Sequence, residues 1–321
     1  MSVAQAVPET WELTGDDARE TLANTGSRKL LRDAFVRLRA ADGFSHARSL
    51  AYLISLLLVQ GLILLVGVAA ALGETDVSAT ITRSVNEAAP GPAGRALTNA
   101  VFHAYQTGTS RQYFVLVVVG IATLITGATV MGQMERALNR LYGIEQDRPT
   151  LQKYGQAILL ALTAGILAVV AFAGFAMGHA IGESIGDDTV ATVWRVLRWP
   201  LALTLMTASI ALLFRWSPRR HQPGWSWLAY GAAISVLLWS LLTLGLGFLF
   251  QTSTTFSQTY GPLAGMIALL FWALLSSIAI LFGAAVAVQL EAVRAGAAAP
   301  RDEAKADDDA APPSSVFADT A

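Results

Sequence analysis

Six long apolar stretches, separated by polar segments, dominate the pattern of the chain. They lie at 49–72, 113–132, 154–180, 196–214, 226–250 and 262–290. Each is long enough to cross a hydrocarbon core of about 30 Å, which takes about 20 helical residues. The runs lack the two-residue alternation of a membrane β-barrel, and backbone groups in lipid must be paired internally, so each run predicts a helix. The predicted fold class is all-α, a polytopic membrane protein with six transmembrane helices that together form a membrane domain over 49–294.

The polar segment before the first apolar stretch divides into two parts. Residues 1–26 are predicted to be a flexible N-terminus, and residues 27–48 a cytoplasmic amphipathic helix. In the second part Leu31, Phe35 and Leu38 share one helical stripe with basic residues around it. Such a helix either lies on an anionic membrane face or packs beneath its own membrane domain, and the two alternatives are compatible.

The segment at 73–112 is longer than a simple connector, which favours a structured loop. Within it, residues 93–106 predict a short helix with Leu97, Val101 and Tyr105 on one side, so we expect a helical outer loop that caps one face of the membrane domain. The tail at 295–321 is rich in Ala, Asp and Pro and has almost no large apolar residues, which predicts a disordered cytoplasmic tail.

The basic residues predict how the chain is threaded. With the N-terminus inside, 17 of the 22 Lys and Arg residues fall on the inner side and five on the outer side. Cytoplasmic loops carry an excess of Lys and Arg, so both termini are predicted to be cytoplasmic, with the protein in the bacterial cell (cytoplasmic) membrane. Anionic lipids of the inner leaflet are the expected partner of this basic side.

Composition narrows the chemistry. The chain is 54% hydrophobic and 14% charged, and its mean hydropathy is +0.50. The near balance of 22 basic and 23 acidic residues excludes a whole-chain nucleic-acid binder. No lysine follows a glycine, so no phosphate-binding loop of the G-x-x-x-x-G-K-[ST] type is present, and there is no cysteine. The four histidines stand on different segments, so we predict no cofactor, no metal site and no catalytic residue.

Small and polar residues inside the apolar stretches carry two further predictions. Glycine recurs every four residues at Gly174, Gly178 and Gly182, which predicts a smooth ridge for helix packing. Gln60 lies in the middle of the first stretch, and Thr123 and Thr126 lie in the second, where they are available to line a polar path. Threonine hydroxyls often bond to carbonyls of their own helix, so a purely structural role is the alternative.

After the second apolar stretch the chain reads E-R-A-L-N-R-L-Y-G at 135–143, and as a helix this run continues the stretch into the cytoplasm. The run resembles the signature of the YihY/BrkB family of inner-membrane proteins, some of which were once labelled ribonuclease BN. The residues that carry the resemblance over about 28–294 include Tyr52, Glu135, Asn139, Arg140, Tyr260, Gly261 and Gly283, together with Leu50, Ala51, Ser55, Pro218, Arg219, Arg220, Pro223, Gly231 and Ala284.

The resemblance implies a six-helix membrane protein with both ends in the cytoplasm, but no settled biochemical activity. Two positions depart from the family pattern. Gln60 stands where many members have proline, and Ala285 stands where many have an acidic residue. If that acid carries an activity elsewhere in the family, this chain has lost or altered it.

Two functional hypotheses from different classes follow. The first is transport or flux of a small solute or lipid, since six packed helices carry no soluble catalytic domain. The second is a structural or scaffolding membrane protein whose basic inner face and acidic tail recruit partners. A ribonuclease is the least favoured hypothesis, because RNA cleavage needs clustered acid–base groups or a metal and the predicted cytoplasmic segments offer neither. The sequence leaves self-association into a homo-oligomer open.

Overall fold

All regular structure in the part of the chain that is described is helical, as the apolar pattern predicts. The computed structural model describes residues 4–71, 82, 85, 89, 91–106, 112–146, 148–149, 151–167, 188–252, 263–297 and 300. Five helices within these residues are long and apolar enough to cross a membrane. They are α3 (Gly43–Ala71), α6 (Gln112–Leu141), α8 (Asp188–Trp216), α9 (Trp225–Thr252) and α11 (Ala264–Arg294).

These five helices correspond to five of the six predicted spans. The third predicted span, 154–180, overlaps a helix at 151–167, and its remainder lies outside the described residues. The number of six spans therefore stays a prediction. α6 runs past the predicted end of its apolar stretch to Leu141, so the signature run at 135–143 continues the helix as expected.

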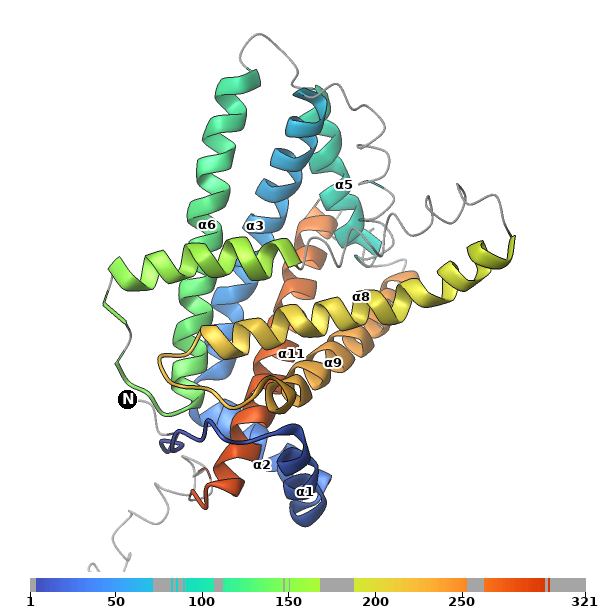
Figure 1. The fold of residues 1–321 in the computed structure, drawn as a ribbon. Helices are drawn as coiled ribbons and strands as arrows, with labels where there is room; N and C mark the ends of the chain where they lie inside the picture. The colour runs from blue at the N-terminus through green and yellow to red at the C-terminus, as the bar shows by residue number, and fades with distance from the viewer. Residues whose placement is uncertain are drawn as a thin grey trace, which may run out of the picture.

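The membrane helices form two arms that meet at α11. In one arm α3 packs on both α6 and α11, and in the other α9 packs on both α8 and α11. Figure 1 shows α8 and α9 diverging from α3 and α6 as they leave the end of the molecule that carries α1 (Gly15–Thr25) and α2 (Ser27–Ala40). We call this end the terminal end, because the last turns of α11 also lie there. The opposite end is the far end.

The helix at 151–167 bridges the two arms. Its residues Leu160 and Ala164 pack against Leu213 of α8 and against Met131 of α6. The Ser209 hydroxyl on α8 also donates a hydrogen bond to the Ala164 carbonyl oxygen, at 3.0 Å. Among the described residues this cluster has far fewer buried side chains than the core of the terminal end, so the arms are joined less extensively here.

At the far end, α5 (Gly91–Gln106) packs on α3 and α11, which confirms a helix within the predicted loop; that this loop is on the outer side stays a prediction. Its residues Leu97 and Val101 are buried in a small apolar cluster with Val66 and Leu269. Both residues are on the predicted apolar side of this helix. The side chain of Tyr105 lies outside the described residues.

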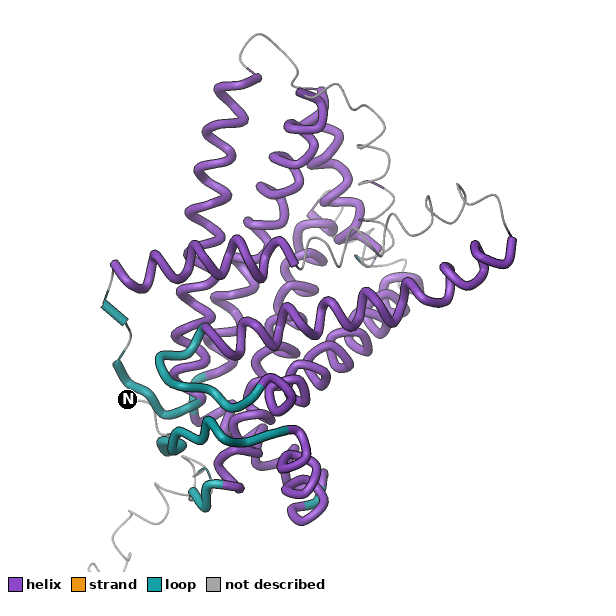
Figure 2. The backbone as a smooth tube through the Cα atoms, in the orientation of Figure 1, coloured by secondary structure: helices purple, strands orange, loops and turns teal. Residues whose placement is uncertain are grey.

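The largest hydrophobic core lies at the terminal end and includes the N-terminal region. Figure 2 shows two long loop segments crowded against the helices there, residues 4–14 and residues 217–224. The N-terminal segment differs from the expected flexible N-terminus at 1–26. Residues 15–25 form α1, and Ala4, Val7 and Ala18 are buried in the core. Apolar contacts that no periodicity signals, together with polar contacts to distant loops, hold this segment in place.

The amphipathic helix predicted within 27–48 is present as α2, and its two faces have different surroundings. Leu30, Ala34 and Leu38 are buried in the core of the terminal end, while Leu31 and Phe35 are exposed. The Phe35 ring contacts the Phe44 ring edge to face, with centroids 6.0 Å apart, at the start of α3. Leu38 therefore lies on the buried face, whereas the predicted stripe placed it with Leu31 and Phe35.

Candidate functional site

The signature run at the end of α6 braces two loops of the terminal end. The buried carboxylate of Glu135 pairs with the Arg148 guanidinium at 3.3 Å. Arg148 in turn donates hydrogen bonds to the carbonyl oxygens of Ser217 and Pro218, both at 2.7 Å. The acidic residue of the signature therefore positions, through Arg148, the loop that follows α8.

Asn139 holds the same loop one helical turn later. Its buried side-chain oxygen accepts a hydrogen bond from the Arg219 backbone N–H at 2.9 Å. Arg140 points the other way and donates to the Glu145 carbonyl oxygen at 3.0 Å, which caps the turn after α6. The predicted residues Glu135, Asn139 and Arg140 thus lie together, and all three hold backbone segments in place.

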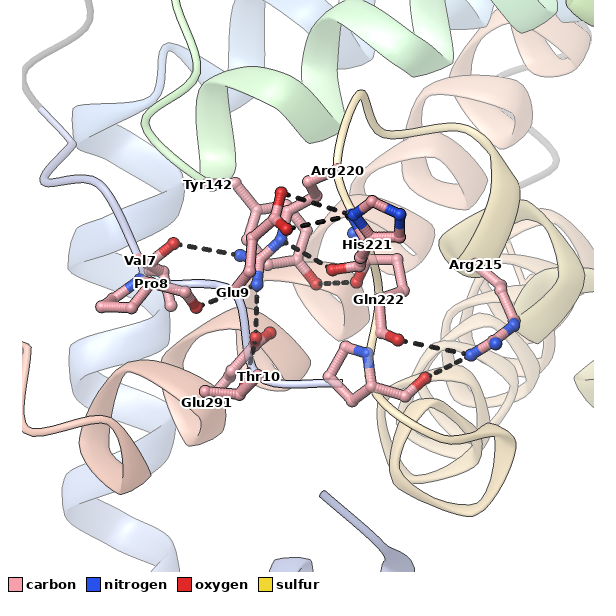
Figure 3. A network of polar contacts seen from close by, with 11 residues as sticks. Val7, Pro8, Glu9, Thr10, Tyr142, Arg215, Arg220, His221, Gln222 and Glu291 are labelled. Carbon is pink, nitrogen blue, oxygen red and sulfur yellow. Dashed lines mark hydrogen bonds and ion pairs between the residues drawn. The ribbon is translucent and has the colours of Figure 1, made fainter. Parts of the chain in front are cut away.

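Beside this brace lies a buried ion pair between two segments far apart in the sequence. An Arg220 guanidinium nitrogen lies 2.5 Å from a carboxylate oxygen of Glu291, and the side chains are 2% and 0% exposed. The Arg220 guanidinium also stacks on the Tyr142 ring, 4.3 Å from its centroid, and the Tyr142 hydroxyl donates to the Gln222 side-chain oxygen at 2.8 Å. Figure 3 shows these side chains turned toward one another. We call Thr10, Tyr142, Arg220, Gln222 and Glu291 the terminal polar centre.

Residues 4–14, which we call the N-terminal strap, cover this centre. Two Arg220 nitrogens donate to the carbonyl oxygens of Val7 and Pro8, at 3.2 and 2.9 Å. The Thr10 hydroxyl donates to Glu291 at 2.6 Å. Figure 3 shows the strap passing directly over the ion pair. The buried charges are therefore shielded from solvent largely by a segment with little regular structure.

A second buried arginine joins the strap to α11. Arg37 of α2 donates to the Gln289 side-chain oxygen at 2.8 Å and to the carbonyl oxygens of Gln5 and Leu141, both at 3.2 Å. Burial lowers the pKa of Arg37 to about 10, since desolvation disfavours its charged form. One end of α2, the strap, α6 and α11 are thus tied together by a single side chain.

Several polar atoms in and beside the centre are buried and have no hydrogen-bond partner among the described residues. They are one carboxylate oxygen of Glu291, the side-chain nitrogen of Gln222 and one guanidinium nitrogen of Arg37. Native proteins leave few such atoms, and each one needs an explanation. The site therefore contains both hydrogen-bond donors and a hydrogen-bond acceptor that are available to a ligand.

Burial raises the pKa of the Tyr142 hydroxyl well above its ordinary value, and the negative charge of Glu291 adds to the shift. Tyr142→Phe is expected to lower the free energy of unfolding by about 1–3 kcal/mol, because Gln222 loses its buried donor. Above pH 10 tyrosine ionises in the unfolded chain while Tyr142 stays neutral in the fold, so the wild type loses stability by about 1.4 kcal/mol per pH unit from this group. The variant lacks that contribution, which urea unfolding in mixed micelles at pH 8 to 11 measures. Tyr52→Phe, at an exposed residue of α3, is the matched control and leaves stability at pH 8 unchanged.

The other predicted residues do not converge on this centre. Tyr52 is 59% exposed on α3. The Thr123 hydroxyl donates to the Val119 carbonyl oxygen of its own helix at 2.8 Å, as in the structural alternative. Gln60 and Thr126 are half-buried, and the Gln60 side-chain oxygen has no hydrogen-bond partner within the part of the chain that is described. Tyr260, Gly261 and the three packing glycines Gly174, Gly178 and Gly182 lie outside the described residues.

Gly283 lies at a close approach of α9 and α11. A Cβ atom there would collide with the Ser235 hydroxyl oxygen and the Gly231 carbonyl oxygen. Gly231 faces it, since a Cβ on that residue would reach the Gly283 carbonyl oxygen at 2.7 Å. Hydroxyl and indole groups also bind across this seam: Trp239 donates to Ser276 at 3.0 Å and Trp272 to Thr243 at 3.1 Å. The hydroxyl groups of Ser235, Thr243 and Ser276 therefore serve the packing of these two helices.

Sequence reasoning missed the central role of Arg37, Gln222 and Glu291. Glu291 follows a long apolar run that reads A-V-A-V-Q-L-E, where hydropathy places it just beyond the predicted span. A single carboxylate and a glutamine at the end of an otherwise apolar run are the signal that the sequence offers. Their partners come from segments that no local pattern connects.

The long apolar helices place the chain in the class of polytopic α-helical membrane proteins. Within that class the chain belongs to the Virulence factor BrkB family, which its residues 34–309 match. This confirms the family resemblance carried by the run at 135–143.

The chain is similar at low identity to bacterial proteins. The chain is 26% identical over 259 residues to the ribonuclease-like protein YfkH of Bacillus subtilis, covering 79% of this chain and 92% of that protein. It is 25% identical over 215 residues to a UPF0761 membrane protein of Xanthomonas campestris, covering 62% of this chain and 49% of that protein. The chain thus spans about half the length of the UPF0761 protein. No solved structure matches.

Proposed function

We propose that this chain moves a small polar solute or a lipid across the bilayer, and that the terminal polar centre is where the polar group binds. The unpartnered oxygen of Glu291 and nitrogen of Gln222 carry the proposal. Both side chains are buried, and ionisable groups buried in membrane proteins commonly mark solute pathways because their desolvation is costly. Polar groups from outside the chain satisfy these atoms when a ligand binds.

The two-arm arrangement supports the same function. Both arms pack on α11 and the core of the terminal end is extensive, whereas the bridge by the helix at 151–167 is small. Transporters commonly alternate access by rocking one bundle against another. In this chain the arm of α8 and α9 moves against the arm of α3 and α6 about α11, and Gln60 of α3 offers a polar group inside the membrane. The helix ridge predicted for Gly174, Gly178 and Gly182 belongs to the same proposal.

Reconstitution into liposomes tests the function. We expect purified protein to move at least one of two probes, labelled glycerol 3-phosphate or a fluorescent phospholipid whose outward-facing copies are bleached by dithionite. Glu291→Gln lowers the rate, since the carboxylate is part of the centre. Glu20→Gln is the matched control, because Glu20 pairs at the surface with Arg294 and does not touch the centre. Absence of movement of both probes contradicts the proposal.

The orientation of the chain is part of the proposal: the terminal end, with both termini, faces the cytoplasm. The absence of native cysteine allows labelling without background. We expect Glu12→Cys and Gln146→Cys, both exposed at the terminal end, to react with a membrane-impermeant maleimide only in inverted vesicles. His103→Cys, exposed on α5 at the far end, reacts in intact cells. The reverse pattern contradicts the orientation.

Contact with lipid follows from the exposed apolar residues of the five membrane helices. The finer expectation is that α2 rests on anionic lipid. Leu31 and Phe35 are exposed beside the exposed basic residues Arg28 and Arg32, and Phe35 contacts the ring at the start of α3. This face of α2 also remains available to a partner protein, which is the scaffold alternative. Neutralising Arg28 and Arg32 separates the two, because a scaffold loses its partner while a transporter core retains flux.

Ribonuclease activity is the other candidate, because the name of YfkH describes it as ribonuclease-like. One exposed acid–base pair is present at the terminal end, His221 with Glu9 at 3.2 Å. Among the described residues no group of three His, Asp or Glu side chains is placed to hold a metal ion. We expect purified protein to leave a fluorogenic RNA intact. Cleavage that His221→Ala abolishes contradicts this expectation.

A further inference from the structure

The N-terminal strap contacts the terminal polar centre through an unusual set of groups. Two Arg220 nitrogens donate hydrogen bonds to the carbonyl oxygens of Val7 and Pro8, and the Thr10 hydroxyl donates to Glu291. A carboxylate or a phosphate binds an arginine in the same way, with two of its oxygens accepting hydrogen bonds from one guanidinium group. Two backbone carbonyls and one hydroxyl of the strap therefore occupy the positions that the oxygen atoms of a ligand would occupy.

We propose that the strap is the resident occupant of a ligand site, and that the site takes a phosphate ester carrying a hydroxyl group when the strap lifts. The phosphate oxygens replace the carbonyls of Val7 and Pro8 on Arg220. The ligand hydroxyl replaces that of Thr10 on Glu291. This inference rests on the proposed function and names the ligand class of the same site.

The charges of the site explain why the hydroxyl matters. Glu291 lies 2.5 Å from Arg220, so the pair is close to neutral and a phosphate alone meets both an attractive and a repulsive charge. A hydroxyl that donates to Glu291 converts the repulsive contact into a hydrogen bond to a charged group, which is among the stronger kinds. The side-chain nitrogen of Gln222 is buried and has no partner among the residues that the structure describes, so it offers one more donor to the same ligand.

The strap is held weakly enough to exchange with a ligand. Its fully buried apolar side chains are Ala4 and Val7, both of them small; Leu13 is partly buried against the core, and Trp11 is 63% exposed. Its other contacts are single hydrogen bonds: Arg37 donates to the Gln5 carbonyl oxygen at 3.2 Å, the Val7 N–H to the Tyr142 carbonyl oxygen at 3.2 Å and the Gly224 N–H to the Leu13 carbonyl oxygen at 3.1 Å. The pair of Glu9 and His221 is exposed. Segments with little apolar burial open locally before the rest of a protein unfolds. A ligand that binds only the open state shifts this equilibrium.

A single engineered cysteine measures the opening. Val7→Cys places a thiol at a buried position of the strap, where it reacts with a maleimide only when the strap lifts. Saturating glycerol 3-phosphate, or nanodiscs of phosphatidylglycerol, is expected to accelerate labelling about tenfold by favouring the open state. Methyl phosphate and phosphatidylmethanol carry the phosphate without the hydroxyl and accelerate it far less. Leu30→Cys, buried in α2, controls for general loosening and shows no acceleration.

Second substitutions in the Val7→Cys background separate the site from the fold. Thr10→Val removes the donor to Glu291 and is expected to raise the labelling rate without ligand about tenfold, the effect of losing one hydrogen bond to a charged group. Thr21→Val is matched, since that hydroxyl bonds within α1, and leaves the rate unchanged. Arg220→Lys abolishes the response to ligand, whereas Arg294→Gln, whose guanidinium pairs with α1, retains it.

The two ligand sources give different labelling patterns. Acceleration by the lipid alone assigns the site to a headgroup, and acceleration by glycerol 3-phosphate alone assigns it to a free solute; both support the inference. Equal acceleration by the probes without a hydroxyl overturns the ligand class, and no acceleration by any probe overturns the site. Labelling that responds to ligand in a protein that moves neither probe in liposomes preserves this inference and contradicts the proposed function.

Discussion

Arg220→Met is expected to lower the free energy of unfolding by about 3–5 kcal/mol, because it leaves the buried carboxylate of Glu291 without its counter-charge. Arg220 also holds the strap through Val7 and Pro8, so the loss includes these contacts. The change is measured by urea unfolding in mixed micelles, with tryptophan fluorescence as the signal. A free energy within about 1 kcal/mol of the wild type contradicts the ion pair as the structure has it.

Two further variants isolate the cause. Arg294→Met also removes an arginine at the terminal end, but the Arg294 side chain is 35% exposed and pairs with Asp17 and Glu20 at the surface. Such pairs contribute about 0–1 kcal/mol, so this control stays close to the wild type. The double variant of Arg220→Met with Glu291→Leu is expected to recover most of the loss, because replacing both members of a buried pair removes the unpaired charge.

The sequence predicts those parts of this fold that depend on local periodicity. Apolar runs long enough to span a bilayer placed five helices at positions the structure confirms, and the short helix at 93–106 is confirmed as α5. Length and hydropathy are enough to predict that these segments are helices, because a backbone segment in lipid has to satisfy its own hydrogen bonds.

The terminal polar centre was beyond such reasoning because its residues come from the strap, the end of α6, the loop after α8 and the end of α11. A flexible N-terminus was expected for the same reason, because local sequence patterns do not show contacts with distant residues. The strap is polar and has no helical or strand period, and its order depends on contacts such as those of Val7 and Thr10 with residues more than a hundred positions away. Polar composition indicates a loose segment only where no distant donor or acceptor binds it.

The signature run shows how a motif and a site differ. Glu135 and Asn139 are buried and hold the loop after α8 through Arg148 and through the Arg219 backbone. Neither touches the ion pair, yet the loop they hold carries Arg220 and Gln222 into place. These residues are positioning residues of the terminal polar centre, and the run is, together with Arg220, the part of the site that can be recognised from the sequence.

Gly283→Leu is expected to destabilise the protein by about 3 kcal/mol or more, toward the upper end of what overpacking costs in a close-packed interior. Every branch of the new side chain begins at a Cβ atom that would collide with Ser235 and with the Gly231 carbonyl oxygen. Relief requires α9 and α11 to separate, which breaks the Ser235 contact to the Ile280 carbonyl oxygen at 3.3 Å and loosens the seam that joins the arm of α8 and α9 to α11.

Gly245→Leu is the matched control, because Gly245 is an exposed residue of α9 where an added Cβ atom would meet nothing within 4 Å. Leucine there costs no packing and favours the helix by about 0.5–1 kcal/mol relative to glycine. The two variants add the same side chain to the same pair of helices, so the difference in their unfolding free energies measures the close approach alone. Equal stability of the two variants contradicts the tight crossing of α9 and α11 and, with it, α11 as the fixed element between the arms.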